Sequence, residues 1–267
     1  MLSKGIVLEQ YSVVEGLADM VSYSSKTNQE VTGVLEGNTD CMFSVHFANE
    51  LVYVKDMSRV WFLAQAWDKD HVLGLLGRGV RSFVVDNESD LDVFLECMKD
   101  SDISVNLLLR VRLREMSVKS EKYFVFGMGS DVVNKRIRSL RSGFRGKLGV
   151  HFHRKTQNMS EWRLKYEVSE MLDEDVLSMI DFVNIGGGLP SKYANTNDDV
   201  LPVIFERIKE LREWLNGMGV KMIIEPGRFI AAPAVRLVTK VIGVYDNTIV
   251  VDASVYNTDM DALIVPV

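Results

Sequence analysis

Residues 81–99, RSFVVDNESDLDVFLECMK, contain one complete strand–helix unit. Residues 81–85 are rich in β-branched and aromatic side chains, which predicts a buried strand. Residues 86–99 have the period of an amphipathic helix with Asp86 as its N-cap. The apolar residues on its predicted inner face are Leu91, Phe94, Leu95 and Met98. The unit therefore predicts a strand that is followed at once by a helix packed against it.

The same alternation recurs along the chain. The predicted strands are 21–25, 41–45, 60–64, 81–85, 105–111, 147–152, 181–185 and 220–224. A second clear helix covers 199–215, where apolar residues recur at three- and four-residue steps. Eight strand–helix units in about 225 residues favour a (β/α)8 TIM barrel of the α/β class, and a doubly wound open sheet is the alternative.

Composition excludes several classes of function. The 267-residue chain has a formal net charge of −6 and 47% hydrophobic residues. A negative balance argues against a nucleic-acid partner, because phosphates attract a basic surface. No apolar run approaches the roughly 20 residues that span a membrane, and the first ten residues lack the apolar centre of a secretion signal. Cys41 and Cys97 are too few for a disulfide framework or a zinc site, so we expect a reduced, cytoplasmic protein.

The pattern changes near the end of the sequence. Residues 234–244 and 248–252 alternate apolar and polar side chains on either side of a turn signal at 246–247. We therefore divide the chain into a barrel, 1–231, and the incomplete start of a β-rich module, 232–267. Two strands with an exposed apolar face are not stable alone, so we expect a second copy in a homodimer, another partner chain or further sequence to cover them.

Lys26 follows the first predicted strand, in the stretch VSYSSKTN at 21–28. The carboxyl ends of the strands carry the chemistry of a TIM barrel. A lysine there can form a Schiff base with an aldehyde cofactor. A solvated lysine at a strand end is the alternative.

Two histidines end the sixth predicted strand, in the segment HFHRKTQ at 151–157. By strand alternation His151 and His153 share one face. They could ligate a metal, but no carboxylate-rich cluster lies near them in the sequence, and we predict no metal site. The alternative is an imidazole stacked on an aromatic cofactor, with Thr156 donating a hydrogen bond to that cofactor.

Glycines follow the seventh predicted strand, in NIGGGLP at 184–190. Consecutive glycines expose backbone N–H groups that can bind an anion, so this segment predicts a phosphate site rather than a flexible connection. The last strand ends in IIEPGRFI at 223–230. Glu225 could pair with a pyridinium nitrogen and Arg228 could reach the phosphate, or the two could form a structural ion pair.

Together these segments resemble the fold-type III pyridoxal-phosphate enzymes, specifically the ornithine/diaminopimelate/arginine decarboxylase group. The similar segments are 23–28 (YSSKTN) for Y-A-V-K-x-N, 43–51 (FSVHFANEL) for F-D-V-A-S-x-x-E-L, 109–111 (LRV) for L-R-I, 125–127 (VFG) for K-F-G, 153–157 (HRKTQ) for H-x-G-S-Q, 184–189 (NIGGGL) for D-I-G-G-G-F and 225–228 (EPGR) for E-P-G-R. They occur in the family's order over about residues 5 to 260.

The resemblance implies an alanine-racemase-like barrel that binds pyridoxal 5'-phosphate. Lys26 would hold the cofactor as an internal aldimine, Glu225 would keep the pyridine nitrogen protonated, and His153 would stack on the ring. The glycines, Arg228 and Thr156 would bind the phosphate, and Arg110 would lie near Lys26. The implied cofactor-binding residues are Lys26, Arg110, His153, Thr156, Gly186, Gly187, Gly188, Glu225 and Arg228.

Several positions depart from the family pattern. Ser44 stands in place of the acidic residue of the second-strand motif, and His46 and Phe47 replace small residues. Val125 and Lys155 replace a lysine and a glycine. The family's second domain supplies a cysteine and a cofactor-contacting tyrosine, which we expect outside this sequence.

The resemblance implies a decarboxylase that acts on an amino acid or an amino-acid-like group, with ornithine, lysine, arginine, diaminopimelate or a conjugate as candidate substrates. One alternative is a cofactor-binding or regulatory relative without decarboxylase activity, which the departure at Ser44 favours. Another is a racemase of the same fold, which Glu225 disfavours because those enzymes need a neutral pyridine nitrogen.

Overall fold

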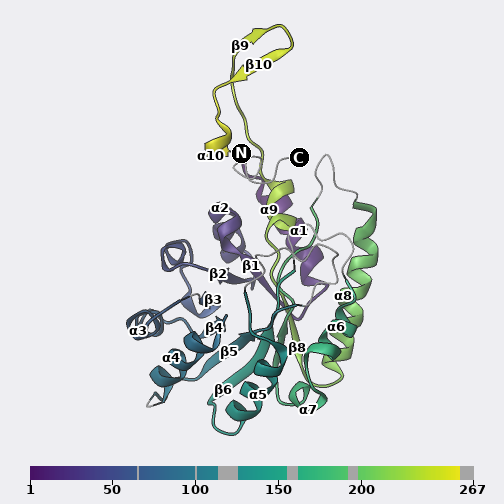
Figure 1. Ribbon diagram of the computed structural model, residues 1–267. Helices are drawn as coiled ribbons and strands as arrows, with labels where there is room; N and C mark the ends of the chain where they lie inside the picture. Colours follow the sequence, from purple (N-terminus) through teal and green to yellow (C-terminus); the bar gives the residue numbers. More distant parts are fainter. Residues whose placement is uncertain (65, 100, 114–125, 155–161, 192–197, 259–267) are drawn as a thin grey trace.

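The computed structural model describes residues 1–64, 66–99, 101–113, 126–154, 162–191 and 198–258. Its centre is a closed barrel of eight parallel strands in chain order (Figure 1). The strands are β1 (Met20–Ser24), β2 (Met42–Val45), β3 (Val60–Ala64), β4 (Ser82–Val85), β5 (Val105–Arg110), β6 (Gly146–His151), β7 (Phe182–Asn184) and β8 (Lys221–Ile224). The barrel closes where Met20 of β1 pairs with Ile223 of β8. The predicted TIM barrel is therefore confirmed, and the open sheet is excluded.

Helices surround the barrel (Figure 1). The helices are α1 (Lys4–Glu15), α2 (Gln29–Glu36), α3 (Lys69–Gly77), α4 (Glu88–Met98), α5 (Ser130–Arg141), α6 (Leu164–Met171), α7 (Glu174–Leu177), α8 (Leu201–Asn216), α9 (Arg228–Ala234) and α10 (Val255–Thr258). Short 3-10 turns are η1 (Ser25–Thr27), η2 (Ala48–Tyr53), η3 (Met57–Arg59) and η4 (Asp198–Val200). Among these described segments, no helix combines the length and apolar composition needed to cross a bilayer.

The strand–helix unit that begins at β4 differs from the prediction at its cap. The side chain of Asn87 accepts the hydrogen bond of the Asp90 backbone N–H and caps α4, so the predicted N-cap at Asp86 was wrong. Asp86 forms an ion pair with Arg110 at the mouth of the barrel. Both side chains can cap a helix, and here Asn87 caps it while Asp86 pairs with Arg110.

Apolar side chains fill both sides of the strands. One set packs between the strands and the helices, and the alternate set fills the interior of the barrel. The buried members of the inner set are Trp61, Leu63, Val84, Leu108, Phe182 and Ile223. Ser22 and Ser44 also point inward, and their hydroxyl groups are 2.8 Å apart. The interior is thus apolar over one part of its length and polar where the strands end.

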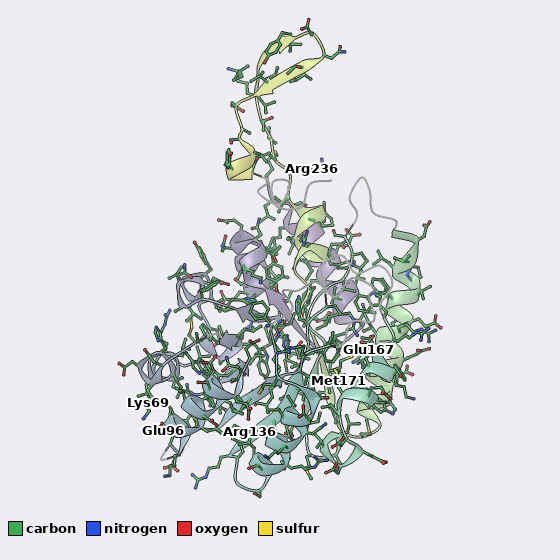
Figure 2. The ribbon with its side chains drawn as sticks, in the orientation of Figure 1. Lys69, Glu96, Arg136, Glu167, Met171 and Arg236 are labelled. Carbon is green, nitrogen blue, oxygen red and sulfur yellow. The ribbon has the colours of Figure 1, made fainter. Side chains whose placement is uncertain are left out.

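A hairpin follows the barrel and extends away from it (Figure 1). Strands β9 (Val241–Tyr245) and β10 (Thr248–Val251) pair antiparallel, and Asp246 in the turn has a φ of +49°. The predicted hairpin is confirmed, but its first strand, Val241–Tyr245, is shorter than the predicted 234–244: α9 continues to Ala234, and the residues from 235 to 240 belong to neither element. Arg236 lies between the barrel and the hairpin, whose side chains project into the surroundings (Figure 2).

Candidate active site

Three of the predicted site residues, Lys26, Arg110 and Glu225, meet at the mouth of the barrel together with His151. Lys26 lies on η1, directly after β1. Arg110 ends β5, His151 ends β6, and Glu225 follows the last residue of β8. Arg110 pairs with His151 in register, and His151 pairs with Asn184. Because parallel strands end on the same face of the barrel, residues far apart in the chain share one site.

Glu225 is the centre of a buried hydrogen-bond network. Its Oε1 accepts hydrogen bonds of 2.8 Å from Ser44 Oγ and of 2.8 Å from Asn184 Nδ2. Its Oε2 lies 3.2 Å from His151 Nε2. Its backbone N–H donates to the carbonyl of Gly186 at 2.8 Å. With 2% of its surface exposed, the carboxylate is fixed in position by groups from three strands.

This network keeps Glu225 negatively charged. Burial alone would raise the pKa of Glu225, but the neighbouring His151 and the hydrogen bonds from the His151 ring and the Asn184 amide outweigh it. The pKa of Glu225 is therefore held well below that of an ordinary glutamate. A permanent negative charge at this point can hold a proton on a heterocyclic nitrogen bound above it.

His153 lies between Glu225 and the opening. Its Nδ1 is 3.9 Å from Glu225 Oε2 and accepts a 3.2 Å hydrogen bond from the backbone N–H of Gly187. Burial lowers the pKa of His153 to about 3, with smaller effects of His151, Arg110 and Lys26 in the same direction and of Glu225 against it. The ring is thus neutral at physiological pH and stays partly accessible from the mouth.

The structure brings together a possible metal-binding group that the sequence spacing does not reveal. One ligand atom each from His151, His153 and Glu225 lies within 4.8 Å of the others. The hydrogen bond from Gly187 to His153 Nδ1 uses the lone pair that a metal ion would need. This favours the predicted stacking role of His153 over metal ligation.

The glycine segment packs against the same residues. Gly186 and Gly188 have φ angles of +66° and +101°, which favour glycine. A Cβ on Gly187 would lie 2.7 Å from the carbonyl oxygen of Glu225, and one on Gly186 would lie 2.5 Å from that of Phe152. The glycines therefore allow the backbone of this loop to lie in contact with Phe152 and His153 and with Glu225 at the end of β8.

The turn after β8 packs against the turn that carries Lys26. A Cβ on Gly227 would lie 2.5 Å from Thr27 Oγ1, and the Ser24 N–H donates a 3.0 Å hydrogen bond to the Pro226 carbonyl. Arg228 follows as the first residue of α9. Thr156, the remaining predicted phosphate ligand, lies outside the described residues.

Lys26 and Arg110 complete the charged groups of the mouth. Lys26 Nζ is 3.4 Å from His46 Nε2. Burial and Arg110 lower the pKa of Lys26, against the opposing charges of Glu50 and Glu225. Arg110 forms a 3.1 Å ion pair with Asp86.

Several residues of this site have roles that the sequence motifs did not predict. The set is Ser44, His46, Asp86 and Asn184. Each stands at or just after a strand end, where polar residues alternate with buried apolar ones. This alternation could have identified them, because inward-facing residues at the carboxyl end of a barrel strand line the mouth.

The residues present fit pyridoxal phosphate. The site offers an amine with a lowered pKa, Lys26, for an aldehyde, and a buried anionic carboxylate, Glu225, for a ring nitrogen. It also offers a glycine loop where added Cβ atoms would collide with neighbouring backbone. These three features agree with the donor set that such a cofactor requires.

Comparisons with known proteins identify the family and the fold. Residues 18–232 match the family described as "Pyridoxal-dependent decarboxylase, pyridoxal binding domain". The chain is 26% identical over 264 residues to a probable chloroplastic diaminopimelate decarboxylase of Oryza sativa subsp. japonica, covering 90% of this chain and 53% of that protein. It is 21% identical over 270 residues to the diaminopimelate decarboxylase of Helicobacter pylori, covering 90% of this chain and 62% of that protein. The chain thus spans between about half and two thirds of these relatives.

Solved structures share the fold. A lysine decarboxylase from Selenomonas ruminantium matches with a TM-score of 0.81 at 22% identity, over 98% of this chain and 72% of that one. A diaminopimelate decarboxylase from M. jannaschi matches with a TM-score of 0.79 at 20% identity, over 95% of this chain and 67% of that one. Because the family match covers most of the chain, the chain belongs to the pyridoxal-dependent decarboxylases and contains their pyridoxal-binding domain.

Proposed function

We propose that this chain is the cofactor-binding barrel of a pyridoxal-phosphate-dependent decarboxylase that acts on an amino acid or an amino-acid-like group. The observation that carries the proposal is the buried, anionic Glu225 at the same barrel mouth as Lys26. The bound cofactor would supply an electron sink for the electron pair left on the substrate when CO2 departs.

Each residue of the site has a role in this proposal. Lys26 attaches the cofactor covalently, and Glu225 keeps the proton on the pyridine nitrogen. The neutral ring of His153 covers one face of the cofactor, because its hydrogen bond from Gly187 fixes its orientation. Arg228 and the glycine loop at 186–188 bind the phosphate, and Arg110 lies close to the attachment point. Thr156 stays a predicted phosphate ligand.

The substrate belongs to the proposal as well. The similar proteins are named as decarboxylases of diaminopimelate, lysine and ornithine. A substrate screen therefore begins with these three amino acids and adds arginine. The two free cysteines, Cys41 and Cys97, support the proposed reducing, cytoplasmic setting.

Assembly with another chain is part of the same proposal. The hairpin exposes Val241, Ile242, Val244, Tyr245 and Ile249 to between 52% and 67% of their surface. Isolated two-stranded sheets are at best marginally stable in water. We propose that a second copy in a homodimer, or another partner chain, covers this hairpin.

A cofactor-binding protein without decarboxylase activity is the second candidate. It is favoured by Ser44, which occupies the position of an acidic residue in the family motif and donates its hydroxyl to Glu225. A racemase is disfavoured, because an anionic Glu225 favours a protonated pyridine nitrogen.

The test adds pyridoxal phosphate to the purified protein, records the absorbance spectrum, and reduces the complex with borohydride before peptide mass spectrometry. We expect an absorbance band of a protein-bound Schiff base, with the label on Lys26. The variant Lys26→Ala should lose both, whereas Lys55→Ala, which removes an exposed lysine, should retain both. A band that persists in Lys26→Ala contradicts the proposal.

The same loaded protein is then screened for CO2 release from the four amino acids. Release from any of them supports the decarboxylase. Cofactor attachment without release from any amino acid favours the second candidate.

A further inference from the structure

His46 reaches Lys26 because β1 and β2 are paired neighbours. Ser24 and Ser44 are partners in the parallel register. Lys26 and His46 each follow their paired serine by two residues. Both side chains therefore stand at the same level of the barrel mouth, and the Lys26 Nζ and His46 Nε2 atoms are 3.4 Å apart.

The group in hydrogen-bond contact with the Lys26 amine is the His46 imidazole and not a carboxylate. Glu50 and Glu225 act on Lys26 electrostatically, but within the described part of the chain neither forms an ion pair with it. Glu50 directs its Oε1 to the backbone N–H of Phe47 at 3.2 Å, and Glu225 is held by its own network. His46 thus provides the direct hydrogen-bond contact of the Lys26 amine.

His46 is a neutral neighbour for that amine. Burial, followed by the neighbouring Lys26, lowers the pKa of His46 to about 4, with smaller effects of His151 and Arg110 in the same direction and of Glu225 against it. Its Nδ1 is buried and has no hydrogen-bond partner among the described residues. At neutral pH the ring therefore lacks the charge by which a carboxylate would stabilise an ammonium group.

We propose that His46 is a positioning residue for Lys26: its ring shields one side of the amine from water and orients it, so that Lys26 can act as a nucleophile toward a carbonyl carbon. An amine must lose its proton before its lone pair attacks a carbonyl carbon, and water leaves when the imine forms. A ring that excludes water from one side of Nζ disfavours the ammonium form, whereas a carboxylate at the same place would favour it.

The reactivity of Lys26 can be measured without a bound cofactor. Trace labelling with acetic anhydride at a series of pH values, followed by mass spectrometry of the Lys26 peptide, gives the midpoint at which the amine becomes reactive. We expect a higher midpoint in His46→Ala, because water enters beside Nζ, and a still higher one in His46→Asp. Each unit of upward shift lowers labelling at pH 7 about tenfold.

The matched control is His71→Ala, which removes an exposed histidine of α3 that pairs with the N-cap residue Asp68. We expect the wild-type midpoint in this variant. A wild-type midpoint in His46→Ala overturns the proposal. His46→Ser, which is also too short to cover Nζ, provides a second variant with the same expected shift.

The experiment separates this inference from the proposed function. A wild-type protein that does not attach pyridoxal phosphate in the borohydride assay contradicts the proposed function. The acetic anhydride profiles of the His46 variants decide the present inference in either case.

Discussion

Ser44 and Glu225 lie 181 positions apart in the chain, and a 2.8 Å hydrogen bond joins them inside the barrel. The Ser44 hydroxyl is in turn 2.8 Å from that of Ser22. A serine on β2 thereby contributes to the position of a carboxylate that follows β8. An acidic side chain at position 44 would place a second negative charge beside Glu225, whereas Ser44 donates a hydrogen bond to it.

Substitutions at Ser44 should separate hydrogen bonding from charge. Ser44→Ala removes the hydrogen bonds to Glu225 and to Ser22 and should lower the free energy of unfolding by about 1–3 kcal/mol. Ser44→Asp should cost more, because two buried carboxylates at this distance disfavour ionisation of both. Urea unfolding measures both changes. Equal stabilities of the two variants at pH 8 would contradict the charge argument.

Neutralising Glu225 should affect activity more than folding. In Glu225→Gln the amide oxygen can still accept hydrogen bonds from Ser44 and Asn184, but the negative charge below the cofactor is lost. We expect the rate of CO2 release to fall by about 100-fold or more, with the cofactor still attached to Lys26. Glu213→Gln on the exposed face of α8 is the control and should keep the wild-type rate. A wild-type rate in Glu225→Gln would show that its charge has no part in the reaction.

The glycine loop should not tolerate a methyl group. Gly186→Ala would introduce a Cβ 2.5 Å from the Phe152 carbonyl oxygen at a positive φ, which we expect to cost about 1–3 kcal/mol of unfolding free energy. Gly33→Ala is the matched control on α2, where an added Cβ meets nothing within 4 Å. It should stabilise the protein by about 0.5–1 kcal/mol. Thermal unfolding of the two variants should therefore shift in opposite directions.

Acid should destabilise the protein through its buried histidines. An unfolded histidine has a pKa of about 6.5, whereas that of His153 is about 3 and that of His46 is about 4 in the fold. Below about 6.5 the unfolded chain therefore binds more protons than the folded one, and stability falls with falling pH. Glu225, whose pKa is lowered, adds a loss at still lower pH.

Urea unfolding between pH 7 and pH 4 tests this dependence. His153→Gln should make stability less sensitive to pH over this range, because the difference in proton binding is reduced. Val203→Gln, on the exposed surface of α8, changes no titratable group and should keep the wild-type dependence. A wild-type dependence in both His153→Gln and His46→Gln would rule out these two histidines as its source.

Charges on the hairpin should disrupt the proposed assembly. Val244 and Ile249 are cross-strand partners, and 67% and 64% of their surfaces are exposed. Lysine at both positions should dissociate the complex, as measured by sedimentation velocity. Val203→Lys, an exposed valine on α8, should leave the assembly unchanged. A wild-type protein that sediments as a monomer would contradict the assembly itself.

The sequence by itself determined the strand–helix units and favoured a barrel over an open sheet, because each unit shows the local period of its strand and of its helix. The apolar run of β4 and the amphipathic pattern of α4 are readable from 81–99 alone, as are Lys26 and E-P-G-R at strand ends. The cap of α4 was not determined in this way, since Asp86 and Asn87 have similar local preferences for that position.

Only the tertiary structure decided which of these strand ends act together. Closure of the barrel brings Ser44, Asn184 and His151 onto one carboxylate, and the register of β1 with β2 places His46 on Lys26. A local period specifies which face a side chain takes, but not the partner it meets across the barrel. That partner is fixed by strand order, register and closure, which depend on contacts between distant parts of the chain.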